Sequence, residues 1–292
     1  MKRVFVSAII IALTVCGLHA QDVKIGVRGG LNLPNIVAGG KNTPLSEGYS
    51  SRLASGWGLF TELKINQTFS FRFGAEYSGM GGKKDGMQAM PTNRLITELG
   101  SSLGLGMTPE QQMALGGMMM WSENMPLYYS DIKNTVKFDY VMIPLLLQVG
   151  HNIGASPFRA YVNAGPFVSF LLSGKQVSKG TSKMYADESG TLTLWNVLPF
   201  EMQYGVAAIF PDIEKTLNEP VVYGSTNVTG ELKSANFGIN GNIGIRYQSN
   251  RNYLFLEVGG NFGFRTIQDD STNGSNRIGA ASVMAGYAFS LF

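Results

Sequence analysis

The sequence predicts an all-β fold, namely an eight-stranded antiparallel transmembrane up-and-down β-barrel with two long, partly helical extracellular loops. Apolar and polar residues alternate over eight long segments, and the connections between those segments are alternately short and long. A soluble β-sandwich would also show alternation, but its strands are usually only about 5–6 residues long. Aromatic residues gather at the segment ends. Those expected in the girdles at the two membrane interfaces are Trp57, Tyr77, Tyr140, Tyr247 and Tyr287.

Residues 1–20 have the layout of a secretory signal peptide, because basic residues from Lys2 onward precede an apolar run that ends near Ala20. The apolar run holds about 15 residues, fewer than the roughly 20 that a membrane-spanning helix needs. A retained anchor and lipid attachment at Cys16 are the alternative interpretations. We expect a mature chain of residues 21–292 without cysteine, so its stability cannot depend on disulfides.

The expected mature chain is nearly neutral. Removing Lys2 and Arg3 leaves 21 basic residues (23 minus 2) against 20 acidic ones, a net charge of +1. This balance gives no support to nucleic-acid binding, so we expect no nucleic-acid partner. The mature chain has one histidine, His151, in a predicted short turn. We therefore expect no catalytic residues, no metal site and no cofactor, and we interpret the protein as non-enzymatic.

The first three strands are expected at residues 22–33, 56–66 and 69–77, with a short turn around 65–68 between the second and the third. The segment FSFRFGAEY is typical of all three. Its aromatic and apolar residues lie on one face, while Arg72 and the other alternate positions are polar or small.

Two long inserts, 80–134 and 173–234, interrupt the alternating pattern. Between them lie VKFDYVMIPLLLQVG and FRAYVNAGPFVSFLL, joined by the turn 150–156. After the second insert come NFGINGNIGIRYQ, YLFLEVGGNFGFRT and a last strand that ends in VMAGYAFSLF. The second insert contains LTLWNVLPF and MQYGVAAIF, which could form an extra hairpin and give ten strands. Pro199 and Pro211 interrupt these runs and favour eight.

The first insert is expected to be partly helical. TPEQQMALGGMMMW starts with Thr108 as a helix cap, Pro109 in the first turn and Gln111 three residues after the cap. NRLITELGSSLG just before it is expected to form a second short helix. The methionines of this insert are expected to pack over the barrel mouth, and the alternatives are an adaptable contact surface or a site for a soft metal.

If the apolar faces contact lipid, the alternate side chains line the lumen. The charged residues expected there are Lys24, Arg28, Glu62, Lys64, Arg72, Glu76, Lys137, Asp139, Arg159, Arg246, Glu257 and Arg265. They must pair or meet water, because a lone buried charge is costly. An eight-stranded barrel is just wide enough to be filled by side chains, so we favour a plugged interior. The alternative, suggested by eight basic against four acidic groups, is a narrow anion-selective pore.

Several segments resemble a known family. KIGVRGGLNL, YVMIPLLLQVG followed by FRAYVNAGPFVSFLLSGK, and the closing AGYAFSLF are similar to the outer-membrane β-barrel family widespread in Bacteroidota, often called the PorT-like family. The resemblance covers essentially the whole mature chain except the two inserts, which look longer than usual. It implies eight strands and few catalytic residues, and some family members act in a protein secretion machine.

The end of the last strand resembles the signal by which the barrel-assembly machinery recognises its clients. Gly286, Phe289 and Leu291 fit a Gly-x-x-apolar-x-apolar spacing, and Phe292 follows. We therefore expect contacts with that machinery and with outer-membrane lipid.

Together these observations predict an integral protein of the Gram-negative outer membrane. It would present the loops 80–134 and 173–234 to a protein partner or take part in an envelope or secretion assembly. The alternatives are a small porin-like diffusion channel with a basic lumen and an outer-membrane enzyme.

Overall fold

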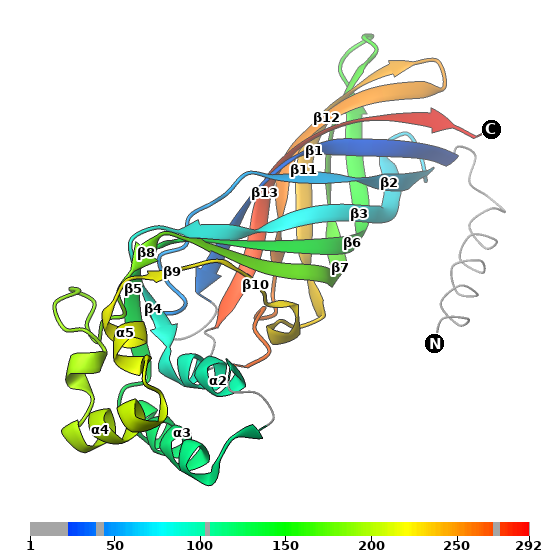
Figure 1. Cartoon of the computed structure of the whole chain (residues 1–292). Coiled ribbons are helices and arrows are strands. Elements are labelled where there is room, and N and C mark those ends of the chain that lie inside the picture. The colour runs from blue at the N-terminus through cyan, green and yellow to red at the C-terminus, as the bar shows by residue number, and fades with distance from the viewer. Residues whose placement is uncertain (1–22, 39–43, 103–105, 271–274, 292) are drawn as a thin grey trace.

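The computed structural model describes residues 23–38, 44–102, 106–270 and 275–291. Its main feature is a ring of eight long antiparallel strands (Figure 1): β1 (Val23–Ala38), β2 (Ala54–Lys64), β3 (Phe69–Lys84), β6 (Lys133–Asn152), β7 (Phe158–Lys179), β11 (Ala235–Ser249), β12 (Asn252–Gly263) and β13 (Asn276–Ser290). Pairing of β6 with β7 and of β1 with β13 closes the ring. The predicted eight-stranded barrel is confirmed, whereas the predicted signal peptide lies outside the described residues.

Tight turns join the strands at one rim of the barrel, which we call the short-turn rim. These turns cover residues 65–68, 153–157 and 250–251. In the first, the side-chain oxygen of Asn66 accepts hydrogen bonds of 2.8 Å from the backbone N–H groups of Thr68 and Phe69. In the third, Asn250 adopts a positive φ of 53°. Asparagine readily accepts backbone hydrogen bonds with its side chain and tolerates a positive φ, which explains why these turns are so short.

The longer connections lie at the opposite rim, which we call the long-loop rim. They join β1 to β2, β3 to β6, β7 to β11 and β12 to β13. Transmembrane barrels have short periplasmic turns and longer extracellular loops, so the long-loop rim is the extracellular one. The strands reach further than the predicted inserts 80–134 and 173–234 allowed, because β3 runs to Lys84 and β7 to Lys179.

The outer face of the barrel is apolar and open. Val27, Leu59, Ile243 and Leu254 are 52%, 61%, 70% and 57% exposed, respectively. Soluble monomers rarely expose continuous apolar surface on this scale, and in a transmembrane barrel such a band contacts lipid. Among the described helices, none is both long and apolar enough to cross a membrane.

Strand β6 shows where the lipid-facing part ends. From Val141 to Val149 its outward positions are apolar, and these nine residues match the roughly 9–11 that a tilted strand needs to span a bilayer. From Lys133 to Asp139 the outward positions are polar, while the inward side chain of Phe138 is buried. The outward face of the strand therefore changes from apolar to polar at this point. We call residues 133–140, together with 78–84 of β3 and 171–179 of β7 beside them, the extension.

Aromatic side chains mark both limits of the lipid-facing band. Trp57 stacks on Tyr77 with ring centroids 5.5 Å apart, and the Tyr77 hydroxyl donates a hydrogen bond to Asp139. Near the short-turn rim, Tyr247 packs against Phe158.

Tyr140 differs from the other aromatic residues predicted in the girdles. Its side chain is only 3% exposed and lies inside the barrel. The girdle prediction was wrong for Tyr140, because the even-numbered residues of β6 face inward along the whole strand.

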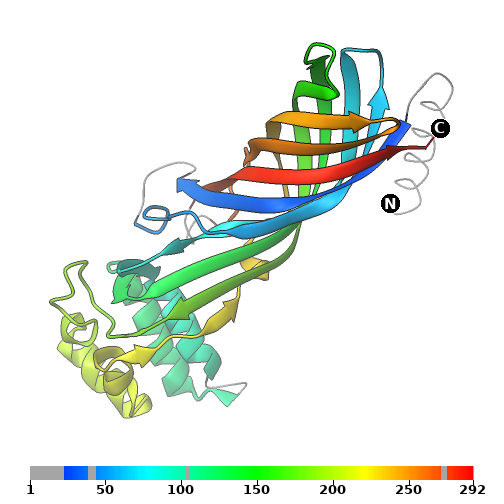
Figure 2. The same ribbon diagram turned by 90° about the horizontal axis from the view of Figure 1, so that it is seen from above.

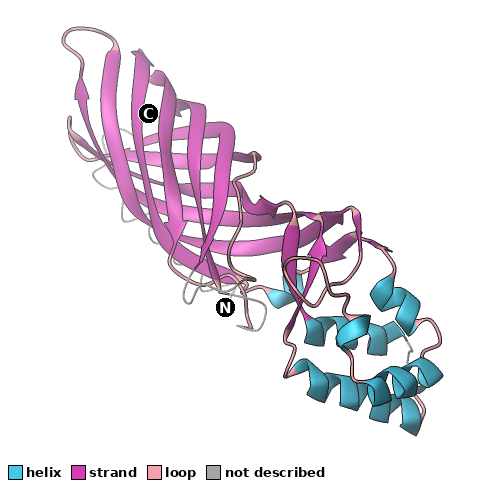
Figure 3. Cartoon of the chain, turned by 90° about the vertical axis from the view of Figure 1, so that its left-hand side faces the viewer, coloured by secondary structure: helices cyan, strands magenta, loops and turns pink. Residues whose placement is uncertain are grey.

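The extension leads to a group of helices outside the barrel. β3, β6 and β7 run on toward them (Figures 1 and 2), and the helices gather at one end of the molecule (Figure 3). The elements there are β4 (Met87–Pro91), α2 (Thr92–Ser102), α3 (Pro109–Ser122), β5 (Leu127–Asp131), β8 (Thr181–Ser182), the 3₁₀ turn Trp195–Val197, α4 (Phe200–Ile209), α5 (Ile213–Asn218) and β9 (Val221–Val222). We call the described residues of 87–131 and 181–222 the helical module. β10 (Ser225–Asn227) pairs with β7, and the 3₁₀ turn Thr229–Glu231 follows it.

The helical module has an apolar core of its own, which includes Ile96, Met118, Trp195 and Leu217. The helix predicted from Thr108 is confirmed as α3, and it begins with the expected capping box. We expected the methionines of this insert to pack over the barrel mouth. Met118 instead packs in the core of the helical module.

The two segments that could have formed an extra hairpin do not pair as strands. MQYGVAAIF falls almost wholly within α4, and LTLWNVLPF contains a 3₁₀ turn. The count of eight barrel strands therefore stands.

Candidate functional site

Charged side chains cross the barrel interior between opposite walls. In the ring of eight strands, β3 lies opposite β12 and β2 lies opposite β11. Arg72 on β3 donates a hydrogen bond to Glu257 on β12. Arg246 on β11 donates a 2.8 Å hydrogen bond to Glu62 on β2. These two pairs tie opposite walls of the barrel together.

Arg28 and Glu76 complete this cluster. A nitrogen of Arg28 lies 3.3 Å from Glu257 and 3.4 Å from Glu76. The Tyr253 hydroxyl donates a further bond to Glu62. Extra hydrogen bonds of this kind offset part of the cost of burying Glu62, whereas Glu76 Oε1 and Glu257 Oε2 have only their ion-pair contacts with Arg28 among the described residues. We call Arg28, Glu62, Arg72, Glu76, Arg246 and Glu257 the interior network, and its three arginines balance its three glutamates.

Aromatic rings fill the space next to the interior network. The guanidinium of Arg72 lies 4.5 Å from the ring centroid of Phe60 and 5.2 Å from that of Phe255. Glycine makes room for these rings, since a Cβ at Gly26 would lie 2.3 Å from Phe60 and one at Gly286 would lie 2.4 Å from Phe255. Closer to the long-loop rim, a cavity of about 10 Å³ has room for a single water. The described side chains therefore plug the barrel.

The structure places eight of the predicted lumen residues inside the barrel: Lys24, Arg28, Glu62, Arg72, Glu76, Arg159, Arg246 and Glu257. Two of them belong to the short-turn rim rather than to the interior network. Lys24 donates to the backbone carbonyl of Arg251 at 3.0 Å, and Arg159 donates to that of Gln67 at 2.6 Å. These two cations therefore hold the turns in place.

The lumen prediction was wrong for Lys64, Lys137, Asp139 and Arg265, whose side chains are exposed or half-exposed. Lys137 and Asp139 lie on the outward face of the extension, where water replaces lipid. Lys64 ends β2 at the short-turn rim, and Arg265 follows β12 and donates to the carbonyl of Ala235. Three of these four residues are basic and one is acidic, so the basic excess that suggested an anion pore falls from four to two inside the barrel.

The predicted assembly signal lies at the end of β13. Gly286 faces inward against Phe255, whereas Phe289 and Leu291 point outward and are 42% and 45% exposed. Phe292 lies outside the described residues. The role of these residues in barrel assembly stays a prediction.

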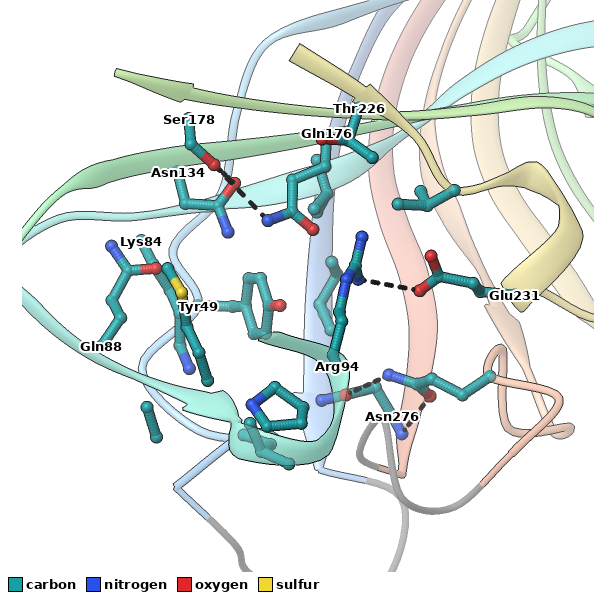
Figure 4. A pocket seen from close by; sticks show the side chains of 18 of the residues that line it. Tyr49, Lys84, Gln88, Arg94, Asn134, Gln176, Ser178, Thr226, Glu231 and Asn276 are labelled. Atoms are coloured by element: carbon teal, nitrogen blue, oxygen red, sulfur yellow. Dashed lines mark hydrogen bonds and ion pairs between the residues drawn. The ribbon is translucent and has the colours of Figure 1, made fainter. Parts of the chain in front are cut away.

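A cavity of about 210 Å³ lies where the barrel mouth meets the helical module, and we call it the mouth cavity (Figure 4). Its floor is the apolar interior of the extension, including Val136 and Phe138. Its polar wall is assembled from separate elements, with Gln88 from β4, Asn134 from β6 and Gln176 from β7. The cavity thus depends on the barrel and the module together.

Arg94 on α2 forms a bridge at the wall of the mouth cavity. Its guanidinium lies 3.1 Å from Glu98 on the same helix and 3.0 Å from Glu231 in the 3₁₀ turn Thr229–Glu231. This pair of contacts attaches the helical module to the segment that enters β11.

The second cation of the mouth cavity is Lys84, which is 9% exposed. Its ammonium donates to the carbonyl of Pro44 at 3.1 Å and lies 4.8 Å from the ring centroid of Tyr49. Burial lowers the pKa of Lys84, and the Glu47 charge opposes this shift. Burial raises the pKa of Tyr49 to about 12, so this phenol is neutral at physiological pH.

The mouth cavity is not predictable from the sequence. Its polar residues come from distant segments that no motif links, namely Tyr49, Arg94, Asn134, Gln176 and Glu231. The sequence offers one signal for a polar site here, namely that Asn134 and Gln176 lie next to two predicted strands. Among the described residues, no group of three His, Cys, Asp or Glu side chains is placed to hold a metal ion.

Comparisons with solved structures found distant likenesses. Among solved structures, Neisserial surface protein A is 10% identical, with 91% of this chain and 96% of that chain covered and a TM-score of 0.35. OprG from Pseudomonas aeruginosa is 11% identical, with 92% and 95% covered and a TM-score of 0.34. A major outer membrane protein from Thermus thermophilus is 12% identical, with 94% and 100% covered and a TM-score of 0.38. No curated protein matches the chain.

A family model described as the outer membrane protein beta-barrel domain matches residues 19–269, which is most of the chain. This match agrees with the closed ring of strands and its apolar outer face. The chain therefore belongs to the outer membrane protein beta-barrel family, and it resides in the outer membrane.

Proposed function

We propose that the protein is a non-conducting and non-enzymatic barrel that holds the helical module outside the membrane, where the module binds a protein partner. The observation that carries this proposal is the extension, because three barrel strands continue beyond the lipid-facing band and lead directly into the module. A flexible loop would need no such support.

The plugged interior supports an anchoring role over transport. The interior network joins opposite walls and is packed with Phe60 and Phe255, so solute passage would require breaking buried ion pairs. Breaking a buried pair typically costs about 3–5 kcal/mol. The porin-like alternative therefore has no supporting observation among the described side chains.

The surface of the helical module supports a binding role. Met113 and Met120, seven residues apart on α3, are 78% and 72% exposed. Phe200 and Tyr204, four residues apart on α4, are 76% and 77% exposed. Aromatic residues and methionine are enriched at protein interfaces, and methionine adapts to different partners.

Conductance in planar lipid bilayers tests the first half of the proposal. The full chain, refolded and confirmed as a barrel by its heat-modifiable migration on a gel, should give no stable conductance steps. Reproducible single-channel steps from the folded protein would replace the proposal with the porin-like alternative.

Crosslinking in intact cells tests the second half. Met113→Cys and Gly205→Cys place a thiol on α3 or α4, and a Cβ at Gly205 meets no other atom within 4 Å. Ala155→Cys at the short-turn rim is the matched control. We expect a discrete protein adduct from the two module positions, identified by mass spectrometry, and not from position 155. If neither module position yields an adduct, the module is not a partner-binding surface.

We also propose that the chain is closest in role to the PorT-like barrels of Bacteroidota and takes part in an envelope or secretion assembly. The segments KIGVRGGLNL and AGYAFSLF support this placement. A partner from the crosslinking experiment that belongs to a secretion machine would bear this out, and a partner unrelated to the envelope would contradict it.

A further inference from the structure

We propose that the mouth cavity binds a neutral, polyhydroxylated ligand about the size of one sugar ring. The proposal is independent of any protein partner, because it concerns the space below the helical module rather than its outer surface. Four properties of the cavity lead to it, namely its size, its charge balance, its unpaired neutral polar groups and its apolar floor.

The size limits the ligand to a small molecule. Pockets for drug-sized ligands usually measure about 300–1,000 Å³, and the mouth cavity has a volume of about 210 Å³. A single ring with its substituents fits a cavity of this volume, whereas a fatty acyl chain or a peptide would need a longer cleft.

The charges of the cavity disfavour an ionic ligand. Arg94 is balanced by Glu98 and Glu231, and the ammonium of Lys84 is covered by a carbonyl and by the ring of Tyr49. An anion entering the cavity would meet two carboxylates, and a cation would meet two positive groups. A neutral ligand avoids both penalties.

Several neutral polar groups of the cavity lack partners among the described residues. Tyr128 is 7% exposed, and neither its hydroxyl nor that of Tyr49 has a hydrogen-bond partner there. The side-chain nitrogen of Asn134 and the side-chain oxygen of Gln176 are likewise without one, since their recorded bonds use the other atom of each amide. These four atoms are not sealed from solvent, so water or a ligand hydroxyl can reach each of them as a partner.

These groups suit hydroxyls in particular. A hydroxyl both donates and accepts, and so does a phenol, while the two amides offer one donor and one acceptor. Figure 4 shows Tyr49, Asn134, Gln176 and Thr226 arranged around the same space from four different elements. Convergence of this kind fixes the orientation of a ligand that carries hydroxyls on several sides.

The apolar floor suits the C–H face of a sugar ring. Val136 and Phe138 line the cavity, and the ring of Tyr49 packs against the apolar cluster to which they belong. An aromatic ring with a polar tip can contact a C–H face and bond a hydroxyl at its rim. The ligand could be a free sugar or the terminal unit of a longer glycan, since both present the same chemistry to the cavity.

Saturation-transfer NMR on the full chain in detergent micelles tests the proposal. The probes are the methyl glycosides of glucose, galactose, mannose and N-acetylglucosamine, with sodium citrate as the anionic comparison. We expect at least one glycoside to bind with a Kd of about 1 mM or tighter and citrate not to bind. An oligosaccharide that ends in the best unit distinguishes the two sources, because it binds at least as tightly if the site takes glycan ends.

Substitutions that remove single hydroxyls tie binding to the cavity. Tyr49→Phe and Tyr128→Phe keep the rings in place, and each should weaken binding roughly 3- to 10-fold because one hydrogen bond is lost. Tyr247→Phe near the short-turn rim, at the other end of the barrel from the cavity, is the matched control and should leave the Kd unchanged. Heat-modifiable migration confirms that each variant is folded.

The proposal is overturned if no glycoside binds below about 10 mM, or if citrate binds instead and Lys84→Met abolishes that binding. It is also overturned if a glycoside binds the folded double variant Tyr49→Phe/Tyr128→Phe as tightly as the unchanged chain. In that case the sugar occupies another part of the surface.

Discussion

The two halves of strand β6 follow opposite rules. Between Val141 and Val149 apolar side chains point outward and the interior beside them holds charges, whereas between Lys133 and Asp139 the apolar side chains point inward. Buried and exposed positions alternate through both halves, although the inward positions Met142, Pro144 and Leu146 of the membrane half are themselves apolar. The register with β7 shifts only where the two halves meet, between Asp139 and Tyr140. Period-two alternation therefore indicates a strand, whereas the medium around the strand decides whether its outward face is apolar.

The largest test of the comparison is to break the ion pairs of the membrane half. Glu257→Leu removes the carboxylate that Arg72 and Arg28 share, and it leaves two buried guanidinium groups under-compensated. We expect a loss of about 3–5 kcal/mol in the free energy of unfolding. The measurement is urea unfolding of the barrel in phospholipid vesicles, followed by gel mobility.

Glu123→Leu is the control for that substitution, because this carboxylate lies in the exposed part of the helical module. Its effect should stay within about 0.5 kcal/mol. A loss below about 1 kcal/mol for Glu257→Leu would contradict an interior network whose members depend on one another.

The second test removes apolar packing from the extension. Phe138 is 3% exposed inside the extension, so Phe138→Ala should cost about 3 kcal/mol locally. Because the lipid-facing band lies below this position, we expect the barrel to keep its heat-modifiable migration while residues 85–132 become several-fold more sensitive to protease. Thr135→Ala, on the outward face of the same segment, serves as the control. Loss of the whole barrel in Phe138→Ala would show that the two halves are one cooperative unit.

The third test places the same charge on the outward face of each half. Leu145 is 45% exposed at the centre of the lipid-facing stretch, and Leu145→Arg should cost about 2–4 kcal/mol. Thr135→Arg lies on the same face of β6 in the extension, where water solvates the charge, and it should change stability by less than about 0.5 kcal/mol. Urea unfolding in vesicles measures both. Equal costs at the two positions would place the membrane boundary elsewhere.

The sequence allowed the barrel and most of its interior charges to be predicted. Arg28, Glu62, Arg72 and Glu257 lie in segments where lipid is outside, so polar residues had to be inside. The same rule misplaced Lys137 and Asp139, because their segment leaves the membrane within an unbroken strand. Where a strand passes from lipid into water, the two-residue period stays the same, and only the polarity of the outward face changes.

The mouth cavity was out of reach of the sequence for a different reason. Its polar wall forms only when α2, β6, β7 and the segment before β2 meet, and those contacts depend on how the module packs on the extension. Arg94 and Glu231 lie 137 positions apart, so local periodicity carries no information on their pairing. Within the helical module, the helix starting after Thr108 was predictable because a capping box is local.

The smallest expected effect concerns the inward charge of the extension. Unlike the interior network, Lys84 has no carboxylate within ion-pair distance among the described residues, and burial lowers its pKa. The folded state therefore holds fewer protons than the unfolded state at pH values just below the ordinary lysine pKa of about 10.4, so stability should rise with pH there. One proton limits this slope to about 1.4 kcal/mol per pH unit. Burial raises the pKa of Tyr49 to about 12. This phenol therefore makes stability fall with pH, but only at pH values near and above its ordinary pKa of about 10.

Urea midpoints of the unchanged chain and of Lys84→Met between pH 8 and pH 9.5 isolate this contribution, because all other titrating groups are common to both proteins. The difference in stability should favour Lys84→Met most at the lower pH and shrink as the pH rises, since methionine has no ammonium to bury. Parallel curves would mean that Lys84 is as well compensated as the arginines of the interior network. The two halves of the barrel would then handle inward charge alike, and the contrast between them would be confined to their outer faces.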